Sequence, residues 1–386
     1  MDQAPGGAAG LGSQRHLFEL PEDVAWINCA QHSPALKSVS DAGTAGLARK
    51  RQPWTIGPAQ HHEDPDRLRT LFARLIGAQA RDIAIVPSVG YGISLAAGNL
   101  ALPPGRRALV LAEQFPSNLY PWRDLAARDG GALATVARPA DGDWTAAVLA
   151  ELDERVAILA LPNYHWLDGG ALDLPRLAAA ARDVGAALVL DLTQSLGAVP
   201  FDLAAVQPDF LIAGTYKWLL GPYSFALLYA APARQAGRPL EQGWNSRAGS
   251  ERRSRLIDYT DRLYDDARRY DMGEAANYIA VPMAIAGLEQ ILAWQPARIA
   301  AGIAPLVEAL AAGAEALGLK ATPAAHRAPH FLGLRADRPL RPDLLDRLKD
   351  EKIYISQRGD SLRVSPHLYN DRAEIDRLLE SLGRLL

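Results

Sequence analysis

Short apolar runs alternate with helical segments through residues 64–214, and this alternation is the feature that most constrains the fold. The segment 64–77 carries apolar residues at i, i+3, i+4 and i+7, the spacing of an amphipathic helix. Strands are predicted at 83–86, 108–112, 132–137, 156–161, 187–190 and 210–214, mostly with helices between them. Strands separated by helices of this length predict an α/β protein with a mostly parallel sheet and helices on both faces.

The length of the chain, 386 residues, suits a large α/β domain with a smaller companion. Residues 1–20, rich in Gly and Ala at their start, are expected to form a disordered tail, and residues 21–290 the large domain. Residues 291–386 predict a smaller C-terminal α/β domain, against which segment 21–50 could pack. Residues 231–272 show little periodicity and predict a long surface loop.

The charge of the chain argues against nucleic acid and anionic membranes as partners, and its cysteine content excludes an intramolecular disulfide. A formal charge of -3 and a pI near 6.3 give no electrostatic footprint for nucleic acid or for an anionic membrane. Cys29 is the one cysteine, so no intramolecular disulfide can form, and its role stays open. The first fifteen residues do not resemble a signal peptide, and no apolar run reaches the ~18 residues of a membrane span. We therefore expect a soluble, cytoplasmic protein without a metal.

Polar and aromatic side chains follow the predicted strands, where open α/β sheets bind their ligands. They include Gln114 and Phe115, then Asn163, His165 and Trp166, and finally Asp191, Thr193 and Gln194. A further segment, 88–92, places small residues at a helix start, where free amides and the helix dipole favour a phosphate. A tight turn with Ser88 as N-cap is the alternative.

One lysine stands in an unusual setting. Lys217 lies among Tyr216, Trp218 and Leu219 at the exit of the predicted strand 210–214. Desolvation would lower the pKa of this lysine and leave a nucleophilic amine, as Schiff-base chemistry requires. An ordinary loop lysine near aromatic residues is the alternative. Asp191 at the end of another strand on the same sheet edge favours the functional interpretation.

Five segments, in order along the chain, carry a family resemblance. They are EQFPSNLYPW, HWLDGGALDL, DLTQSLGAVPFDLAAVQPDFLIAGTYKWLLGPYSFALLYA, YDMGEAANYIAVPM and LRVSPHLYND. From about residue 21 to its end, the chain resembles the class V aminotransferase group of fold-type I pyridoxal phosphate enzymes, which includes cysteine desulfurases, kynureninase and isopenicillin N epimerase. The resemblance implies a seven-stranded, mostly parallel sheet between helices, a pyridoxal 5'-phosphate cofactor, an amino-acid substrate and a homodimer.

The resemblance also implies roles for single residues. Lys217 would bind the cofactor as a Schiff base and then transfer the proton at the substrate α-carbon, which makes it catalytic together with Asp191. Asp191 would pair with the pyridinium nitrogen and Phe115 would stack on the ring. The remaining cofactor contacts would come from Ser88, Val89, Gly90, Asn163, His165, Thr193, Gln194, Tyr216 and Asn277, with Gln194 on the phenolic oxygen and Val89 and Gly90 on the phosphate.

On the substrate side, Arg363 matches the family arginine that grips the carboxylate, and Arg358 is its nearest competitor. His32 and Trp166 could line the same side. The alternatives are a solvent-facing Arg363, packing roles for His165 and Trp166, and a helix-capping role for His32 with its neighbours.

The chain departs from the family pattern at two places, one of which bears on the subunit contact and the other on the reaction. Residues 273–277 read GEAAN where many relatives carry Gly-Thr-Pro-Asn, so the contact from a neighbouring subunit to the phosphate stays open. Residues 351–362 contain no cysteine, which argues against a desulfurase that forms a persulfide. We expect an aminotransferase, with a lyase (β-elimination, C–S or C–C cleavage) or an epimerase as alternatives. A catalytically silent binding protein is disfavoured because Asp191 and Lys217 are both present.

Overall fold

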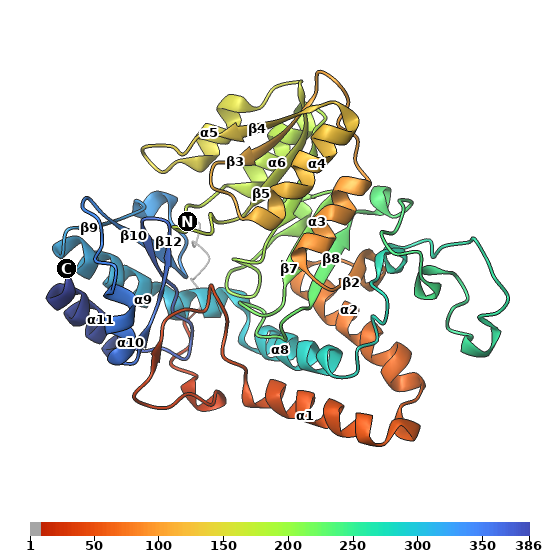
Figure 1. The fold of residues 1–386 in the computed structure, drawn as a ribbon, viewed down its shortest axis with the longest axis horizontal. Coiled ribbons are helices and arrows are strands. Elements are labelled where there is room, and N and C mark those ends of the chain that lie inside the picture. Colours follow the sequence, from red (N-terminus) through yellow and green to blue (C-terminus); the bar gives the residue numbers. More distant parts are fainter. Residues whose placement is uncertain (1–8) are drawn as a thin grey trace, which may run out of the picture.

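The computed structural model describes residues 9–386 and confirms the α/β class (Figure 1). Its central sheet has seven strands in the order β2-β8-β7-β6-β5-β3-β4. The strands are β2 (Ile83–Val86), β3 (Arg107–Leu111), β4 (Ala132–Val136), β5 (Val156–Pro162), β6 (Ala187–Asp191), β7 (Phe210–Gly214) and β8 (Ala226–Ala230). β8 runs antiparallel to β2 and β7, whereas the other neighbouring pairs are parallel. The sheet is therefore mostly parallel, as expected.

Helices cover both faces of this sheet because the strands are apolar on both sides. They are α2 (Asp64–Ile76), α3 (Val89–Gly98), α4 (Tyr120–Asp129), α5 (Trp144–Glu151), α6 (Leu174–Asp183), the short α7 (Leu203–Val206) and α8 (Ala280–Trp294). One apolar cluster joins α3 and α4 to the sheet, and a second joins α2, α5, α6 and α8 to the other face. Gly92 lets α3 approach β7, since a Cβ there would stand 2.9 Å from Ile212.

The C-terminal part has its own core around a four-stranded antiparallel sheet of order β12-β13-β10-β9. The strands are β9 (Leu319–Ala321), β10 (Leu332–Ala336), β12 (Ser356–Arg358) and β13 (Ser361–Val364), and the helices are α9 (Pro296–Ala316), α10 (Leu344–Asp350) and α11 (Arg372–Leu385). Within residues 9–386, α9 alone is long and apolar enough to cross a membrane. Its stripe Ile299, Ile303, Val307 and Leu310 is buried in this core.

The N-terminal segment differs from the expected tail. Residues 1–8 lie outside the described part of the chain, but residues 9–20 pack against the C-terminal part. Phe18 is buried beside Trp294 and Tyr369, and Arg15 forms an ion pair with Glu374 at 3.0 Å. The expectation of disorder was wrong for this stretch because its few apolar groups find partners that are distant in sequence.

The next segment links the N-terminus to both parts of the molecule. β1 (Ala25–Trp26) pairs in parallel with β11 (Ile353–Tyr354), and α1 (Lys37–Arg51) then runs beside α8 (Figure 1). No side chain caps α1, since Ser33 Oγ instead donates to the carbonyl of Tyr216 at 3.3 Å. The domain boundary predicted near residue 290 stays a prediction.

Residues 231–272 form the predicted long loop, broken only by short 3-10 helices, and much of it projects to one side of the molecule (Figure 1). Tyr259 is 95% exposed near its tip. Asp271 anchors the other end, where its carboxylate accepts from the amide of Ile85 at 2.8 Å and pairs with Arg69.

Candidate active site

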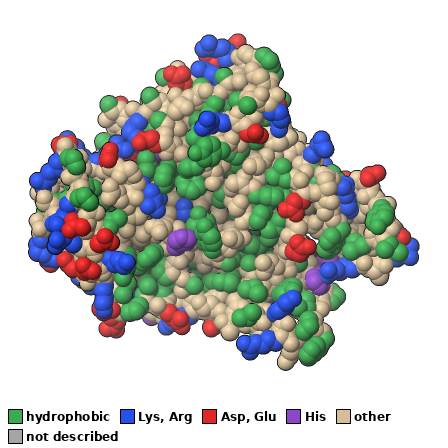
Figure 2. All heavy atoms as spheres, viewed as in Figure 1, with side chains coloured by type: hydrophobic (Ala, Val, Ile, Leu, Met, Phe, Trp, Pro, Cys, Tyr) green, Lys and Arg blue, Asp and Glu red, His purple; other side chains and the backbone are tan. Residues whose placement is uncertain are grey.

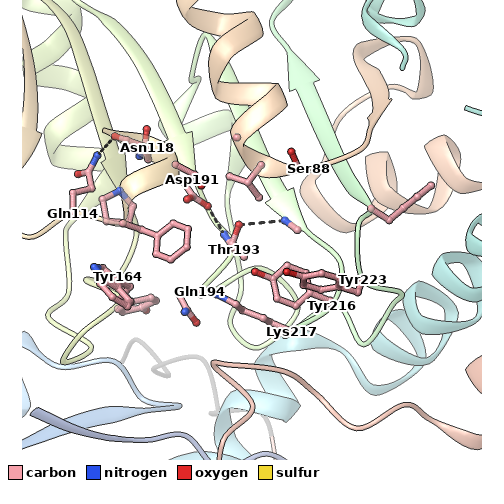
Figure 3. Close-up of a pocket in the computed structure, with 18 of the residues that line it drawn as sticks. Ser88, Gln114, Asn118, Tyr164, Asp191, Thr193, Gln194, Tyr216, Lys217 and Tyr223 are labelled. Atoms are coloured by element: carbon pink, nitrogen blue, oxygen red, sulfur yellow. Dashed lines mark hydrogen bonds between the residues drawn. The ribbon is translucent and has the colours of Figure 1, made fainter. Parts of the chain in front are cut away.

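Two adjoining chambers lie at the C-terminal ends of the central strands, and Figure 3 shows side chains that line the inner one. The inner chamber, about 260 Å³, extends from the ends of β6 and β7 to the start of α3. The outer chamber, about 240 Å³, continues toward β12 and β13. Five side chains border both chambers: Phe115, Trp166, Tyr216, Lys217 and Tyr223. Ligands that fill the two chambers would therefore meet at Lys217.

Lys217 is buried, and its pKa falls from 10.5 to about 7. Burial is the main cause, and the positive charge of Arg363 adds to it, while Asp191 acts in the opposite direction. Its amine nitrogen lies 5.4 Å from the centre of the Tyr216 ring. A substantial fraction of this lysine is therefore a free amine near neutral pH, which is the form that attacks a carbonyl group.

Asp191 ends β6 and is buried within the inner chamber. One carboxylate oxygen accepts from the amide of Thr193 at 3.0 Å, and Thr193 Oγ1 accepts from the amide of Gly214 at 3.2 Å (Figure 3). Burial raises the pKa of Asp191, although the contact with Thr193 and the charge of Lys217 oppose this. A buried carboxylate of this kind gains most from a cationic hydrogen-bond donor in the chamber.

The start of α3 forms the opposite corner of the inner chamber. Ser88 caps the helix, because its Oγ accepts from the amide of Tyr91 at 3.1 Å. The first amides of the helix, those of Val89 and Gly90, have no intrahelical partner and lie at the chamber wall. Ser117 approaches from the segment after β3, since a Cβ on Gly90 would stand 3.7 Å from its side chain. This corner suits a phosphate.

Gln194 is held at the wall of the inner chamber by several hydrogen bonds. Its Nε2 donates to the carbonyl of Ala30 at 3.1 Å, and its Oε1 accepts from Trp218 at 3.0 Å. His330, a buried histidine whose pKa burial lowers to about 4, donates to its backbone carbonyl at 2.6 Å. The side chain is thus fixed at the chamber wall, and its second amide hydrogen can still donate to a ligand.

Aromatic rings and two arginines shape the outer chamber. Phe115 meets Trp166 edge to face at 5.3 Å between ring centres, and Trp166 Nε1 donates to the carbonyl of Glu113 at 2.7 Å. Arg363 is buried rather than solvent-facing, and its Nη1 donates to the carbonyl of Trp166 at 3.1 Å. Arg358 is partly buried on the neighbouring strand.

His32 is an exposed residue of the outer chamber, with its ring 5.3 Å from those of both Tyr216 and Tyr223. Burial of part of the ring and the charge of Lys217 lower the pKa of His32. The ring is therefore available as a neutral hydrogen-bonding group at the entrance.

The structure does not place all predicted residues inside the chambers. Asn163 borders neither of them, and exposed Asn277 accepts from the amides of Ile279 and Ala280, just before α8, at 3.0 and 2.9 Å. His165 reaches the inner wall, but its ring stacks on Trp144 and donates to the carbonyl of Ala112. The predicted cofactor contacts of these three residues find no support in this chain's own chambers.

The chamber walls also contain residues to which the sequence analysis gave no role, among them Ser117, Tyr164 and Tyr223. Tyr223 follows the Gly-Pro turn after Lys217, and its ring meets that of Tyr216 at 4.8 Å. Ser117 and Tyr164 follow β3 and β5 at the expected sheet edge. Their position after a strand was the available signal, but it does not show which side chain turns inward.

Comparisons with known proteins show the family to which the chain belongs. Residues 58–299 match the family model described as Aminotransferase class-V. The uncharacterized aminotransferase YcbU of Bacillus subtilis (strain 168) is 25% identical over 336 residues, which cover 83% of this chain and 84% of YcbU. Isopenicillin N epimerase of Amycolatopsis lactamdurans is 27% identical over 410 residues, which cover 98% of this chain and 99% of the epimerase.

Solved structures share the fold at lower sequence identity. A mutant of C-DES with glycine covalently linked to its pyridoxal phosphate superposes with a TM-score of 0.87 at 21% identity, covering 97% of this chain and 100% of that one. Cysteine desulfurase from Thermococcus onnurineus NA1 gives a TM-score of 0.85 at 19% identity, with coverages of 98% and 99%. The predicted fold-type I architecture is therefore confirmed.

Proposed function

The chain belongs to the class-V aminotransferase family of pyridoxal 5'-phosphate enzymes, and from this premise we propose that it is an aminotransferase acting on the α-carbon of an amino acid. The inner chamber fits the cofactor in three respects. It offers the amine of Lys217, the buried carboxylate of Asp191 and the free amides at the start of α3. These match an aldehyde, a ring nitrogen and a phosphate.

When bound, the cofactor supplies a ring that withdraws electrons from the substrate α-carbon. The protein would supply the proton transfers and the binding of the substrate through a few side chains. The carboxylate of Asp191 would keep a proton on the ring nitrogen, and the amine of Lys217 would take the proton from the α-carbon. Arg363 would hold the substrate carboxylate through its guanidinium, which orients the α-carbon toward Lys217.

The observation that carries this proposal is the burial of Lys217 between a carboxylate and a guanidinium. A pKa near 7 lets the same amine accept and return a proton close to physiological pH. Phe115 and Trp166 would exclude water from this proton transfer. Phe115, which borders the inner chamber near the amine of Lys217, would stack on the cofactor ring.

Borohydride reduction of the purified protein tests the covalent attachment. Reduction should fix the cofactor on the peptide that contains Lys217, as read by mass spectrometry, and Lys217→Ala should lose the fixed cofactor. Lys320→Ala is the matched control, because Lys320 is exposed, pairs with Asp337 at 2.8 Å and borders neither chamber. A protein that stays colourless after incubation with the cofactor would refute the assignment.

The reaction type needs a second experiment, since the same residues serve related chemistries. Incubation with an amino-acid panel should convert the bound cofactor to its amine form and release a keto acid. An epimerase is the second candidate, because an isopenicillin N epimerase aligns along almost the whole chain. Solvent deuterium entering the α-carbon with inversion would favour that candidate, and pyruvate with ammonia or sulfide would favour a lyase.

We further propose that the protein acts in the cytoplasm as a homodimer. Asn277 lies away from this chain's own chambers, on a surface next to the long loop, and could reach the site of a second copy. Large apolar side chains are exposed on the same protein, with Trp54 79% and Ile257 75% exposed. Sedimentation equilibrium that gave a monomer would contradict the dimer.

A further inference from the structure

The outer chamber contains two guanidinium groups, Arg358 and Arg363, although one is enough to hold a substrate carboxylate. We propose that the substrate is an amino acid with an anionic side chain, that Arg363 binds its α-carboxylate, and that Arg358 selects the side-chain anion. This inference deepens the proposed function and rests on it. Carboxylate is the simplest group of this class, and a sulfinate or sulfonate would offer the same oxygen acceptors.

The strand register brings the two arginines to one face. β12 and β13 pair antiparallel with Ser356 opposite Arg363 and Arg358 opposite Ser361. Arg358 and Arg363 are therefore diagonal neighbours on the same side of the hairpin, at a spacing of about 7–8 Å that long side chains can bridge. The positions directly opposite the two arginines carry the small residues Ser356 and Ser361.

Neither charge is neutralised by the protein. Among residues 9–386, no carboxylate forms an ion pair with Arg358 or Arg363. Arg358 instead donates to Gln31 Oε1 at 3.4 Å and to the carbonyl of Gln357 at 2.8 Å, while Arg363 donates to the carbonyl of Trp166. These neutral acceptors orient both groups and leave their charges free. The buried Nε of Arg363 has no partner at all in the described chain.

Holding the two positive charges of Arg358 and Arg363 in one chamber costs electrostatic free energy. Burial and the charge of Arg358 lower the pKa of Arg363 to about 9, and burial also lowers the pKa of Arg358. One substrate carboxylate would compensate only one of the two groups. A second anion would compensate the other, so the electrostatic free energy favours a ligand with two anionic groups.

The position of Arg358 indicates where the second anion lies. Arg363 is almost fully buried, whereas Arg358 is partly exposed and lies in the same chamber as exposed His32. Figure 2 shows Lys or Arg spheres beside hydrophobic groups in the region between the C-terminal part and the large domain. The α-carboxylate would thus lie deep, beside Lys217, and the side chain would extend toward the entrance.

Isosteric acids without an amino group test the arginine pair directly. Calorimetric titration of the cofactor-loaded protein at pH 8 would compare succinate with butyrate and glutarate with valerate. At least one dicarboxylate should bind about tenfold or more tightly than its monocarboxylate partner. Arg358→Gln should abolish this preference, Arg358→Lys should retain part of it, and Arg176→Gln, at an exposed position of α6, should leave it unchanged.

Two outcomes would overturn the inference: equal affinities for both members of each pair in the native protein, or a dicarboxylate preference that persists in Arg358→Gln. The first needs no variant, so a misfolded variant cannot hide the answer. Equal affinities would indicate a substrate side chain held by the aromatic walls. These acids undergo no reaction, so their binding is separate from the proposed function, whose failure would appear as the absence of a borohydride-fixed cofactor on Lys217.

Discussion

The amine nitrogen of Lys217 lies 5.6 Å from the centre of the Phe115 ring, and both side chains border the inner chamber. An aromatic ring at this distance from the anchoring lysine can stack on a planar cofactor. We expect Phe115→Leu to weaken cofactor binding by about two- to twelvefold, since aromatic stacking contributes about 0.5–1.5 kcal/mol beyond area burial. Titration of the cofactor-free protein, followed by absorbance, gives the dissociation constant.

Phe115→Tyr keeps the ring and should bind the cofactor like the native protein. Tyr120→Leu removes a ring of similar size at a position that is 59% exposed and outside both chambers, so it should also have no effect. Native affinity in Phe115→Leu would mean that Phe115 does not touch the cofactor.

The buried amine of Lys217 should make the cofactor-free protein less stable near neutral pH. In the folded state this lysine loses its proton near pH 7, whereas the unfolded chain holds it to about pH 10.5. Between these values the unfolded state binds more protons, so the free energy of unfolding rises with pH. Lys217→Met should therefore stabilise the cofactor-free protein at pH 7 by up to about 5 kcal/mol, because each pKa unit is worth about 1.4 kcal/mol.

The gain should shrink as the pH rises toward 10.5, because the lysine of the unfolded chain then also loses its proton, and it should disappear above about pH 11, where the lysine is neutral in both states. Urea unfolding at pH 7 and pH 9.5 measures both values. Lys320→Met, at an exposed position, should show neither the gain nor its pH dependence. A gain that is the same at the two pH values would mean that the amine is not desolvated.

The central sheet and its catalytic edge were predictable from the sequence, because period and residue type act locally. The strand ends at Asp191 and Gly214 could be predicted from apolar runs bounded by polar or glycine residues. The burial of Lys217 could be predicted from its aromatic neighbours. By contrast, β8 was not predicted as a strand. Residues 226–230 are a short apolar run, and their antiparallel place between β2 and β7 depends on pairing with segments far away in the chain.

Parts of the site also depend on long-range packing. Whether Arg363 faces inward or outward is not visible in its strand, because the alternation of side chains does not say which face is covered. The N-terminal segment orients two other side chains of the site. Gln31 contacts Arg358 and Ala30 contacts Gln194, each across more than a hundred residues of sequence. The role predicted for Asn277 stays a prediction, since its side chain accepts from the amides of Ile279 and Ala280 away from this chain's own chambers.

The ion pair of Arg69 and Asp271 should hold α2 and the long loop on the sheet. Both side chains are buried, and Asp271 also accepts from the amide of Ile85. Asp271→Asn should lower the free energy of unfolding by about 3 kcal/mol or more, because it leaves the buried guanidinium of Arg69 with only the exposed carboxylate of Asp66 as counter-ion. Asp66→Asn removes the exposed partner of the same Arg69 and should cost less than about 1 kcal/mol. Urea unfolding that gave equal losses would contradict a special role for the buried pair.

The guanidinium of Arg363 should determine affinity for the carboxylate of the substrate. We expect Arg363→Gln to lower kcat/KM for amino acids by about 30- to 5,000-fold, since removing one partner of a buried, hydrogen-bonded charge pair costs about 2–5 kcal/mol. Arg363→Lys should recover only part of this, because an ammonium group cannot donate two parallel hydrogen bonds to a carboxylate. Trp166 should stay in place, as its ring nitrogen donates to Glu113 independently of Arg363.

An amine that lacks the carboxylate but is otherwise the same as the substrate shows whether Arg363 acts in binding the substrate carboxylate or in supporting the folded chamber. It should react slowly with the native protein and at a similar rate with Arg363→Gln, because the guanidinium has no group to hold. Transfer to the cofactor can be followed by absorbance in single-turnover experiments. If the variant lost the amine reaction as strongly as the amino-acid reaction, Arg363 would support the architecture of the outer chamber rather than the substrate carboxylate.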